Sequence, residues 1–237
     1  MSSQTAVLAG ATGALGQAIA RALSLKGFQV WCGYNESEGK AESLAAELGG
    51  RAVRLSSLAD PVQALEKISE NNNPIGLLIN ASGINIEGHA LSFEPDDWQK
   101  VHEVNFNWAL RLTQAALRIM LPQGGGRIIH LSSSAARFGG RGQLNYAVSK
   151  AALERLVRGL ALEVGPKGIL INAVAPGVIR SPMAQRVIDR YGDKLLERIA
   201  SRRFGRPEEV AQVVAFLAGP EATYINGAVL PVDGGLW

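Results

Sequence analysis

A phenol and an ammonium group stand four residues apart in the segment Tyr146-Ala-Val-Ser-Lys150. Residues at this spacing share one face of a helix, so the two side chains can act together. A free phenol has a pKa of about 10, and a nearby ammonium lowers that pKa because it favours the phenolate. The pair predicts a tyrosine that acts as a general acid or base, although the same spacing also describes a packed tyrosine beside a solvated lysine.

Three serines, Ser132 to Ser134, follow the apolar segment Ile128-Ile-His-Leu131. At the end of a strand, the hydroxyl of Ser133 is placed to polarise a carbonyl oxygen next to the Tyr146 phenol. The alternative for all three serines is the ordinary chemistry of a turn that follows a strand.

A glycine-rich segment, Gly10-Ala-Thr-Gly-Ala-Leu-Gly16, lies between an apolar segment and a helix-forming one. Glycines allow the backbone to approach a pyrophosphate closely, and the first N–H groups of a helix bind its charge. The segment predicts a dinucleotide site. A glycine-rich turn without a ligand is the alternative, because the motif also occurs by chance.

Short apolar segments alternate along the chain with longer segments of helical period, and no low-complexity linker separates them. This alternation is typical of βαβ units, whose strands are apolar on both faces because helices cover both sides of the sheet. We therefore predict one α/β domain, residues 1–237, with a doubly wound, Rossmann-like parallel sheet. The expected strands are 5–9, 29–32, 52–55, 75–79, 127–131, 169–174 and 228–232, and the expected helices are 15–26, 38–48, 61–71, 96–119, 145–164 and 207–218.

Motifs at seven places follow one another in a fixed order: Gly10-x-x-x-Ala14-x-Gly16, Asn80-Ala-Ser-Gly83, Asn105, Ser133, Tyr146-x-x-x-Lys150, Pro176-Gly177 and Val232-Asp-Gly-Gly235. In order and spacing they resemble the short-chain dehydrogenase/reductase family over nearly the whole chain. Within that family, the segments that begin at Gly126, Asn145, Ile171 and Gly205 are most similar to the 3-oxoacyl-acyl-carrier-protein reductases. The resemblance implies NADPH-dependent reduction of a 3-oxoacyl thioester in fatty-acid, polyketide or polyene synthesis.

The resemblance also implies a catalytic tetrad. Tyr146 is the general acid, and Lys150 lowers its pKa and holds the nicotinamide ribose. Ser133 binds the substrate oxygen, and Asn105 anchors a water of the proton relay. The cofactor contacts implied by the same resemblance are Gly10, Thr12, Gly13, Leu15, Gly16, Tyr34, Asn35, Ser57, Leu58, Asn80, Ala81, Ser82, Gly83, Tyr146, Lys150, Pro176, Gly177, Ile179 and Ser181.

The end of the second expected strand bears on the choice between NADPH and NADH. An acid at that position binds a ribose 2′-hydroxyl and repels a 2′-phosphate, and Tyr34 followed by Asn35 stands there instead. This favours NADPH. The family's middle glycine of the phosphate turn is Ala14, however, and the family's acid after the third strand is replaced by Ser57, so two usual cofactor contacts differ.

Residues 182–205 occupy the position of the family's substrate lid, which excludes water when it closes. A surplus of basic side chains there favours an acidic carrier protein or a phosphopantetheine phosphate, and a solvated amphipathic helix is the alternative. Arg127 and Lys167 are further docking candidates that we expect near the rim of the site. The basic residues of the lid region are Arg180, Arg186, Arg190, Lys194, Arg198, Arg202, Arg203 and Arg206.

The composition excludes several other classes of function. The net charge of +3 comes without a basic block, so no nucleic-acid partner is expected. No apolar segment approaches the length of a membrane span, and the first residues lack the pattern of a signal peptide, so we expect no membrane partner and a cytoplasmic location. The three histidines are not spaced as ligands, and the single Cys32 cannot form an intramolecular disulfide, so no metal site is expected.

Two alternatives to the carrier-protein substrate remain open. One is a dehydrogenase that acts on a free small ketone or alcohol such as a sugar, steroid or quinone. The other is a catalytically silent dinucleotide-binding partner, against which the intact Ser133, Tyr146 and Lys150 argue. Under either enzyme hypothesis the resemblance implies a homotetramer.

Overall fold

Parallel strands form one seven-stranded sheet in the computed structural model, which describes residues 4–70 and 73–236. The strand order is β3-β2-β1-β4-β5-β6-β7, so the order along the chain reverses between β1 and β4. All carboxyl ends lie at one edge because each neighbouring pair is parallel. The predicted doubly wound sheet is confirmed. The strands are β1 (Thr5–Ala9), β2 (Gln29–Tyr34), β3 (Arg51–Arg54), β4 (Ile75–Asn80), β5 (Gly126–Leu131), β6 (Ile169–Pro176) and β7 (Val229–Val232).

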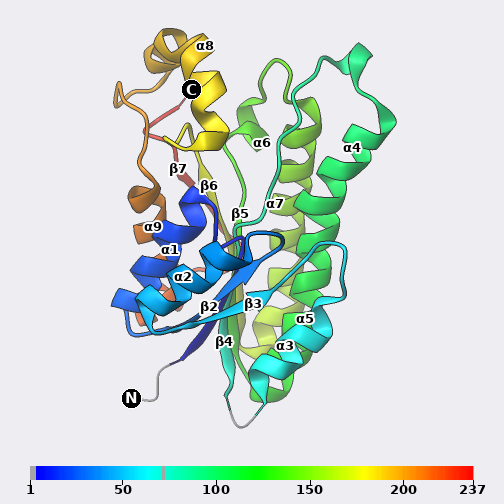
Figure 1. Cartoon of the computed structure of the whole chain (residues 1–237), viewed down its shortest axis with the longest axis vertical. Helices are drawn as coiled ribbons and strands as arrows, with labels where there is room; N and C mark the ends of the chain where they lie inside the picture. The colour runs from blue at the N-terminus through cyan, green and yellow to red at the C-terminus, as the bar shows by residue number, and fades with distance from the viewer. Residues whose placement is uncertain (1–3, 71–72, 237) are drawn as a thin grey trace.

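Helices cover both faces of this sheet (Figure 1). Side chains alternate between the two faces along a strand, so Leu8 joins one buried cluster and its neighbour Val7 joins the other. Both residues are fully buried, which explains why the strand segments are apolar throughout. One face carries α1 (Ala14–Leu25), α2 (Glu38–Leu48) and α9 (Pro207–Ala218), and the other carries α3 (Pro61–Ser69), α5 (Trp108–Gln123) and α7 (Leu144–Val164).

A π-helical turn interrupts the helix that the sequence predicts over 96–119. The segment contains α4 (Pro95–His102), the π turn η2 (Glu103–Asn107) and α5, which extends beyond the prediction to Gln123. Asn105 lies in η2 and is completely buried. A π turn inserts one extra residue into a helix and is often found at functional sites. The predicted helix 61–71 ends earlier, at Ser69, and position 71 is outside the described residues.

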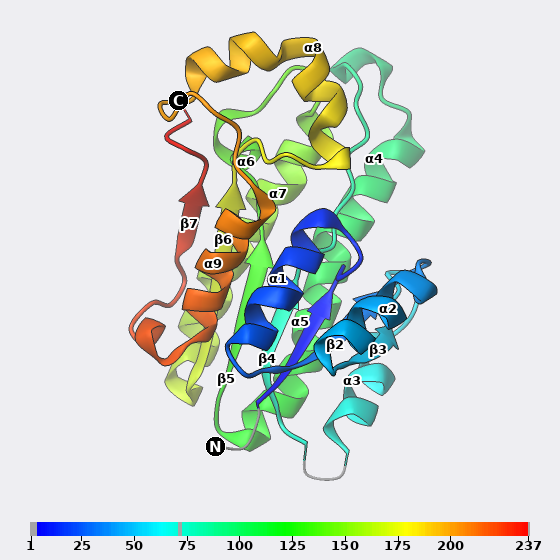
Figure 2. The same ribbon diagram turned by 60° about the vertical axis from the view of Figure 1, so that its left-hand side comes forward.

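The region predicted to be a lid contains a helix, α8 (Pro182–Arg198), which lies beyond the end of the sheet toward which the strand arrows point (Figure 2). None of its side chains is buried. Its C-terminal end is tied to the end of the chain, because Ile199 forms an antiparallel bridge with Leu236. The remaining short helices are η1 (Ala90–Ser92), α6 (Ala135–Phe138), η3 (Gly165–Lys167) and η4 (Pro220–Ala222).

Candidate active site

The turn between β1 and α1 leaves no room for side chains at two of its glycines. Gly10 has φ +79°, and a Cβ on it would lie 2.8 Å from the carbonyl carbon of Ala81. A Cβ on Gly16 would lie 2.1 Å from the carbonyl oxygen of Gly10. No side chain caps the start of α1, so its first N–H groups remain available to an anion. The turn has the geometry of a phosphate cradle.

Three other cofactor candidates, Thr12, Gly13 and Leu15, lie in the same turn and at the start of α1. The carbonyl oxygen of Thr12 accepts a hydrogen bond from Gln17 Nε2 at 3.0 Å, which fixes the turn from inside. Gly13 is exposed at the N-cap of α1, and an added Cβ there meets only ordinary contacts, the nearest at 3.7 Å. Leu15 packs against the buried cluster on the α1 side.

The loop after β4 lies directly beside this turn, at the point where the strand order reverses. Ala81 N donates to Ala9 O at 2.9 Å, and Asn80 Oδ1 accepts from Ser82 N at 3.1 Å. Gly83 packs against two members of the expected tetrad, because its added Cβ would lie 3.2 Å from Lys150 Nζ and 3.4 Å from Asn105 Oδ1. The structure thus brings the predicted nicotinamide side and the tetrad together.

Ser133, Tyr146 and Lys150 converge at the carboxyl end of β5. A hydrogen bond joins the Ser133 and Tyr146 side chains. Lys150 lies one turn further along α7, with its Nζ 5.7 Å from the centre of the Tyr146 ring. That Nζ donates to the carbonyl oxygen of Leu131 at 2.8 Å, which fixes its position in the interior. The spacing in the sequence therefore produces the predicted juxtaposition.

Burial changes the pKa of both titratable groups. The pKa of the Tyr146 phenol is raised by burial, and the hydrogen bond with Ser133 opposes this rise. Burial lowers the pKa of the Lys150 ammonium to about 8. In the free protein the phenol therefore holds its proton at neutral pH, as a proton donor must.

Asn105 uses its side chain to hold the loop after β4. Its Oδ1 accepts from Ile84 N at 2.9 Å, and its Nδ2 donates to Ile84 O at 3.0 Å and to Ser149 Oγ at 3.0 Å. Ser149 in turn donates to Tyr146 O at 2.7 Å. Both amide hydrogens are thus used within the protein, and the contribution of this residue to a water relay stays a prediction.

The ends of β2 and β3 form the far side of the candidate site. Tyr34 is buried, and its hydroxyl donates to Glu38 of α2, whereas Asn35 is exposed. Leu55 N donates to Tyr34 O at 2.7 Å, which brings the loop with Ser57 and Leu58 beside the end of β2. The candidates at these two strand ends are therefore neighbours.

The loop after β6 connects the site to α8. A Cβ on Gly177 would lie 2.7 Å from Asp233 Cα, so this glycine allows the loop to touch the chain after β7. Pro176 O accepts from Ser134 N at 2.8 Å, next to Ser133. Ile179 is buried, and Ser181 caps α8 by accepting from Ala184 N at 3.3 Å.

Two docking candidates do not lie where the sequence analysis expects them. Arg127 is the second residue of β5, and Lys167 precedes β6, so both stand at the amino ends of parallel strands. Within one chain this is the edge opposite the tetrad, and the expectation that they line its rim is wrong. Arg127 Nη1 instead donates to Leu217 O at 3.2 Å.

The basic side chains near α8 divide into two groups. Arg202 Nη1 donates to the carbonyl oxygens of Leu196 and Glu197, at 3.3 and 2.8 Å, and so caps the end of α8. Arg203 forms two hydrogen bonds with Glu209, at 2.8 and 2.6 Å. Arg186, Arg190 and Lys194 are exposed at intervals of four residues along α8 and form one basic stripe.

Comparison with known proteins decides the family. Residues 10–237 match the family described as "Enoyl-(Acyl carrier protein) reductase". The chain is 37% identical over 241 residues to nodulation protein G of Rhizobium sp. (strain N33), covering 100% of this chain and 98% of the relative. It is 35% identical over 237 residues to 3-oxoacyl-[acyl-carrier-protein] reductase FabG of Escherichia coli, covering 98% and 96%. The chain belongs to the short-chain dehydrogenase/reductase family.

Solved structures agree with this assignment. A gluconate 5-dehydrogenase from Burkholderia cenocepacia, in complex with NADP and tartrate, superposes with a TM-score of 0.95 at 26% identity and covers 100% of this chain and 96% of that one. The protein described as gox2181 superposes with a TM-score of 0.95 at 29% identity, covering 99% and 96%. As a short-chain dehydrogenase/reductase, the chain is an NAD(P)-dependent oxidoreductase, and the glycine turn and uncapped α1 of this structure fit that dinucleotide.

The described parts of this family member contain neither a candidate membrane-spanning helix nor a candidate metal-ligand cluster. None of the helices in those parts combines the length and apolar character that a membrane crossing requires. Within residues 4–70 and 73–236, no group of three or more His, Cys, Asp or Glu side chains is arranged to hold a metal ion.

Sequence reasoning missed several residues that support the candidate site of this short-chain dehydrogenase/reductase. Ser149 links Asn105 to the backbone of Tyr146, and its position three residues after Tyr146 is the only signal in the sequence. Leu131 acts through its carbonyl oxygen, which leaves no signal in the side-chain pattern. Arg111, on α5, connects the loop after β3 to Glu103, and charge patterning alone does not reveal this contact.

Proposed function

We propose that this protein reduces a 3-oxoacyl thioester to the 3-hydroxyacyl product with NADPH, and that the acyl group is carried on acyl carrier protein. The observation that supports it most is the cluster of Ser133, Tyr146 and Lys150 at the carboxyl end of β5, beside the reversal of strand order. Ligands of doubly wound sheets bind at this position. Relatives of 31% and 35% identity that are named 3-oxoacyl-[acyl-carrier-protein] reductase support this substrate class.

The side chains of this cluster have separate roles in a carbonyl reduction. Ser133 donates a hydrogen bond to the substrate oxygen and holds it beside the Tyr146 hydroxyl. The bound nicotinamide would supply the hydride that adds to the carbonyl carbon. The C=O π electrons move onto the oxygen, and Tyr146 transfers its proton there, so that one C–H and one O–H bond form as the π bond breaks. Lys150 stabilises the phenolate that remains.

The dinucleotide would lie along the carboxyl edge of the sheet. Gly10, Gly13 and Gly16 with the start of α1 would hold its diphosphate. Asn80 and Gly83 would line the nicotinamide side, and Ile179 and Ser181 would contact the carboxamide and diphosphate from the base of α8. The remaining contacts are assigned to Thr12, Leu15, Tyr34, Asn35, Ser57, Leu58, Ala81, Ser82, Tyr146, Lys150, Pro176 and Gly177.

The preference for NADPH rests on Tyr34 and Asn35, which stand at the end of β2 in place of an acid. The Glu38 carboxylate nearby accepts from the Tyr34 hydroxyl, and Asn35 is exposed. In Asn35→Asp the new carboxylate would repel a 2′-phosphate, so we expect the ratio of the KM for NADPH to the KM for NADH to rise about tenfold, the equivalent of ~1.4 kcal/mol. Asn35→Gln is the neutral control. A ratio unchanged in Asn35→Asp would contradict a 2′-phosphate contact at this position.

The region 182–205 is assigned to a substrate lid, and the basic stripe of Arg186, Arg190 and Lys194 suits an acidic carrier protein. In this proposal the protein is a cytoplasmic homotetramer. Light scattering of the purified protein tests the tetramer, and a monomer at micromolar concentration would contradict it.

A panel of substrates tests the reaction itself. NADPH oxidation is followed with an acetoacetyl thioester, either on carrier protein or on a small thiol. A crotonyl thioester, which is an enoyl substrate, and free ketones that include 5-ketogluconate are compared with it. The proposal predicts the highest kcat/KM for the carrier-bound 3-oxoacyl thioester. Faster turnover of 5-ketogluconate would favour a sugar dehydrogenase, as in the solved structure that superposes well. Binding of NADPH without turnover of any substrate would indicate a silent dinucleotide-binding protein.

A further inference from the structure

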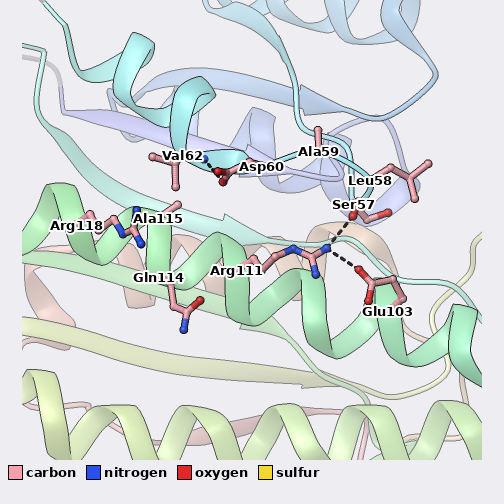
Figure 3. Close-up of a pocket in the computed structure, with 10 residues that line it drawn as sticks. All are labelled: Ser57, Leu58, Ala59, Asp60, Val62, Glu103, Arg111, Gln114, Ala115 and Arg118. Atoms are coloured by element: carbon pink, nitrogen blue, oxygen red, sulfur yellow. Dashed lines mark hydrogen bonds and ion pairs between the residues drawn. The ribbon is translucent and has the colours of Figure 1, made fainter.

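The loop that follows β3 is held in place by an arginine from α5. Arg111 Nη2 donates to the carbonyl oxygen of Ser57 at 2.7 Å and to Glu103 Oε1 at 2.6 Å (Figure 3). Ser57 and Arg111 are 54 positions apart in the chain, so the contact joins two separate elements. One guanidinium thus bridges the loop and the helix that carries η2.

Glu103 is fixed on both of its carboxylate oxygens. Arg111 binds Oε1, and Asn107 Nδ2 donates to Oε2 at 2.8 Å. These hydrogen bonds lower the pKa of the Glu103 carboxyl, with Asn107 as the larger cause and Arg111 next. The carboxylate therefore stays ionised at neutral pH and orients the guanidinium toward Ser57.

Packing also restricts the Arg111 side chain. Its guanidinium carbon lies 6.0 Å from the centre of the Trp108 ring, and that ring is almost completely buried. The exposed fractions of the Arg111 and Glu103 side chains are 38% and 35%, so solvent screens the pair only in part. A cavity of about 580 Å³ lies beside the contact, and Arg118 lines it two turns further along α5.

The loop has few other restraints. Ser56 Oγ accepts from Leu58 N at 3.2 Å, and Asp60 caps α3 by accepting from Val62 N at 3.0 Å. Leu58, between these two contacts, leaves its side chain 90% exposed. Leu55 N, bonded to Tyr34 O, holds the start of the loop beside β2, and the carbonyl of Ser57 is the point at which α5 holds the rest of it.

We propose that Arg111 is a positioning residue for the adenine end of the dinucleotide, because it bridges Ser57 O and Glu103 and so pre-orders the loop of Ser57 and Leu58. This inference rests on the proposed function, which assigns that loop to the cofactor. A loop ordered before binding loses less conformational freedom when the ligand arrives, so affinity increases. Asn105 shares η2 with Glu103, but among the described residues no hydrogen bond or ion pair joins Arg111 to a member of the tetrad. We therefore expect Arg111 to act on cofactor binding and not on hydride or proton transfer.

Fragments of the cofactor separate positioning from a general structural role. Binding of NADPH, of adenosine 2′,5′-bisphosphate and of reduced nicotinamide mononucleotide is measured by titration calorimetry on Arg111→Ala. We expect roughly 5- to 20-fold weaker binding of NADPH and of the adenosine fragment, and unchanged binding of the nicotinamide fragment. In turnover, KM for NADPH should rise by about the same factor while kcat changes less than about twofold.

Two further variants sharpen this test. Arg118→Ala removes the same residue type from the same helix and the same cavity, and among the described residues Arg118 has no hydrogen bond or ion pair, so its binding constants should match the wild type. Arg111→Lys keeps the charge but cannot reproduce the planar guanidinium, so it should lie between wild type and Arg111→Ala. If Arg111→Ala fails to fold, Arg111→Lys with at least threefold weaker adenosine-fragment binding supports the inference.

The outcomes distinguish this inference from the function on which it rests. Tight NADPH binding by the wild type and equal binding by Arg111→Ala or Arg111→Lys would overturn the role of Arg111 alone. Equal losses for the adenosine and nicotinamide fragments would also overturn it, because they would indicate general disruption. A wild type that binds neither NADPH nor NADH would overturn the proposed function and this inference together.

Discussion

Lys150 reaches across from α7 to β5, where its Nζ donates a 2.8 Å hydrogen bond to the carbonyl oxygen of Leu131. The amine is thereby held in the protein interior, and burial lowers its pKa to about 8. Serine follows Leu131 at positions 132 to 134, so the same strand end places both the lysine and Ser133. The position of the tetrad thus depends on where β5 ends.

The lowered pKa of Lys150 predicts the pH dependence of reduction. Below pH of about 8 the amine is charged and stabilises the Tyr146 phenolate that proton transfer leaves behind. As the pH rises through 8 this charge is lost, so kcat/KM for NADPH, which reports the free enzyme, should fall with an apparent pKa near 8. A profile that stays level up to pH of about 10, the ordinary range of a lysine, would contradict the burial of a charged amine here.

Because His130 is buried and neutral, we expect the free energy of unfolding to fall in acid. Thr113 donates its hydroxyl hydrogen to Ala109 O at 2.7 Å, so His130 Nε2, 3.1 Å from Thr113 Oγ1, donates to that oxygen. Burial, with a smaller effect of Lys150, lowers the pKa of His130 from 6.5 to about 3.

The sign of this effect follows from the two states of the protein. The unfolded chain binds a proton at His130 below pH 6.5, and the folded protein does not bind it until about 3. The free energy of unfolding therefore falls as the pH drops through this window, by about 2 kcal/mol between pH 7 and 5. Urea unfolding of wild type and His130→Asn should show a larger loss in the wild type. Equal losses would mean that His130 is protonated in the fold.

Substitution by alanine should have a large effect at one glycine of the phosphate turn and a small effect at another. A Cβ on Gly16 would overlap the carbonyl oxygen of Gly10 at 2.1 Å, whereas a Cβ on Gly13 finds its nearest contact at 3.7 Å. We expect Gly16→Ala to lower the free energy of unfolding by about 3 kcal/mol or more and to abolish cofactor binding. Gly13→Ala should change stability by less than about 1 kcal/mol. Calorimetric melting measures both, and equal melting temperatures would contradict the crowded turn.

The sheet and the tetrad follow from local patterns in the sequence. Val7 and Leu8 point to opposite faces and both are buried, so continuous apolar segments indicate a sheet that helices cover on both faces. The pair of Tyr146 and Lys150 depends only on helical spacing, which the sequence contains directly.

The contacts that support the site depend on distant parts of the chain. The π turn at Glu103–Asn107 appears as ordinary helical sequence, and the bridge from Arg111 to Ser57 joins residues far apart along the chain. Such contacts appear only once the topology is known. The error for Arg127 is of another kind, because the expected strand 127–131 already places this residue at the amino end and Ser133 beyond the carboxyl end, as the structure has them.

Tyr146 is the group on which the proposed chemistry depends most, so Tyr146→Phe tests it most directly. The ring and its packing remain, and only the hydroxyl that bonds to Ser133 is lost. We predict that the variant binds NADPH as the wild type does, while kcat for the acetoacetyl thioester on carrier protein falls by about 10²- to 10⁴-fold. A Tyr146→Phe protein that binds NADPH and reduces this substrate at the wild-type rate would contradict the assignment of Tyr146 as the proton donor.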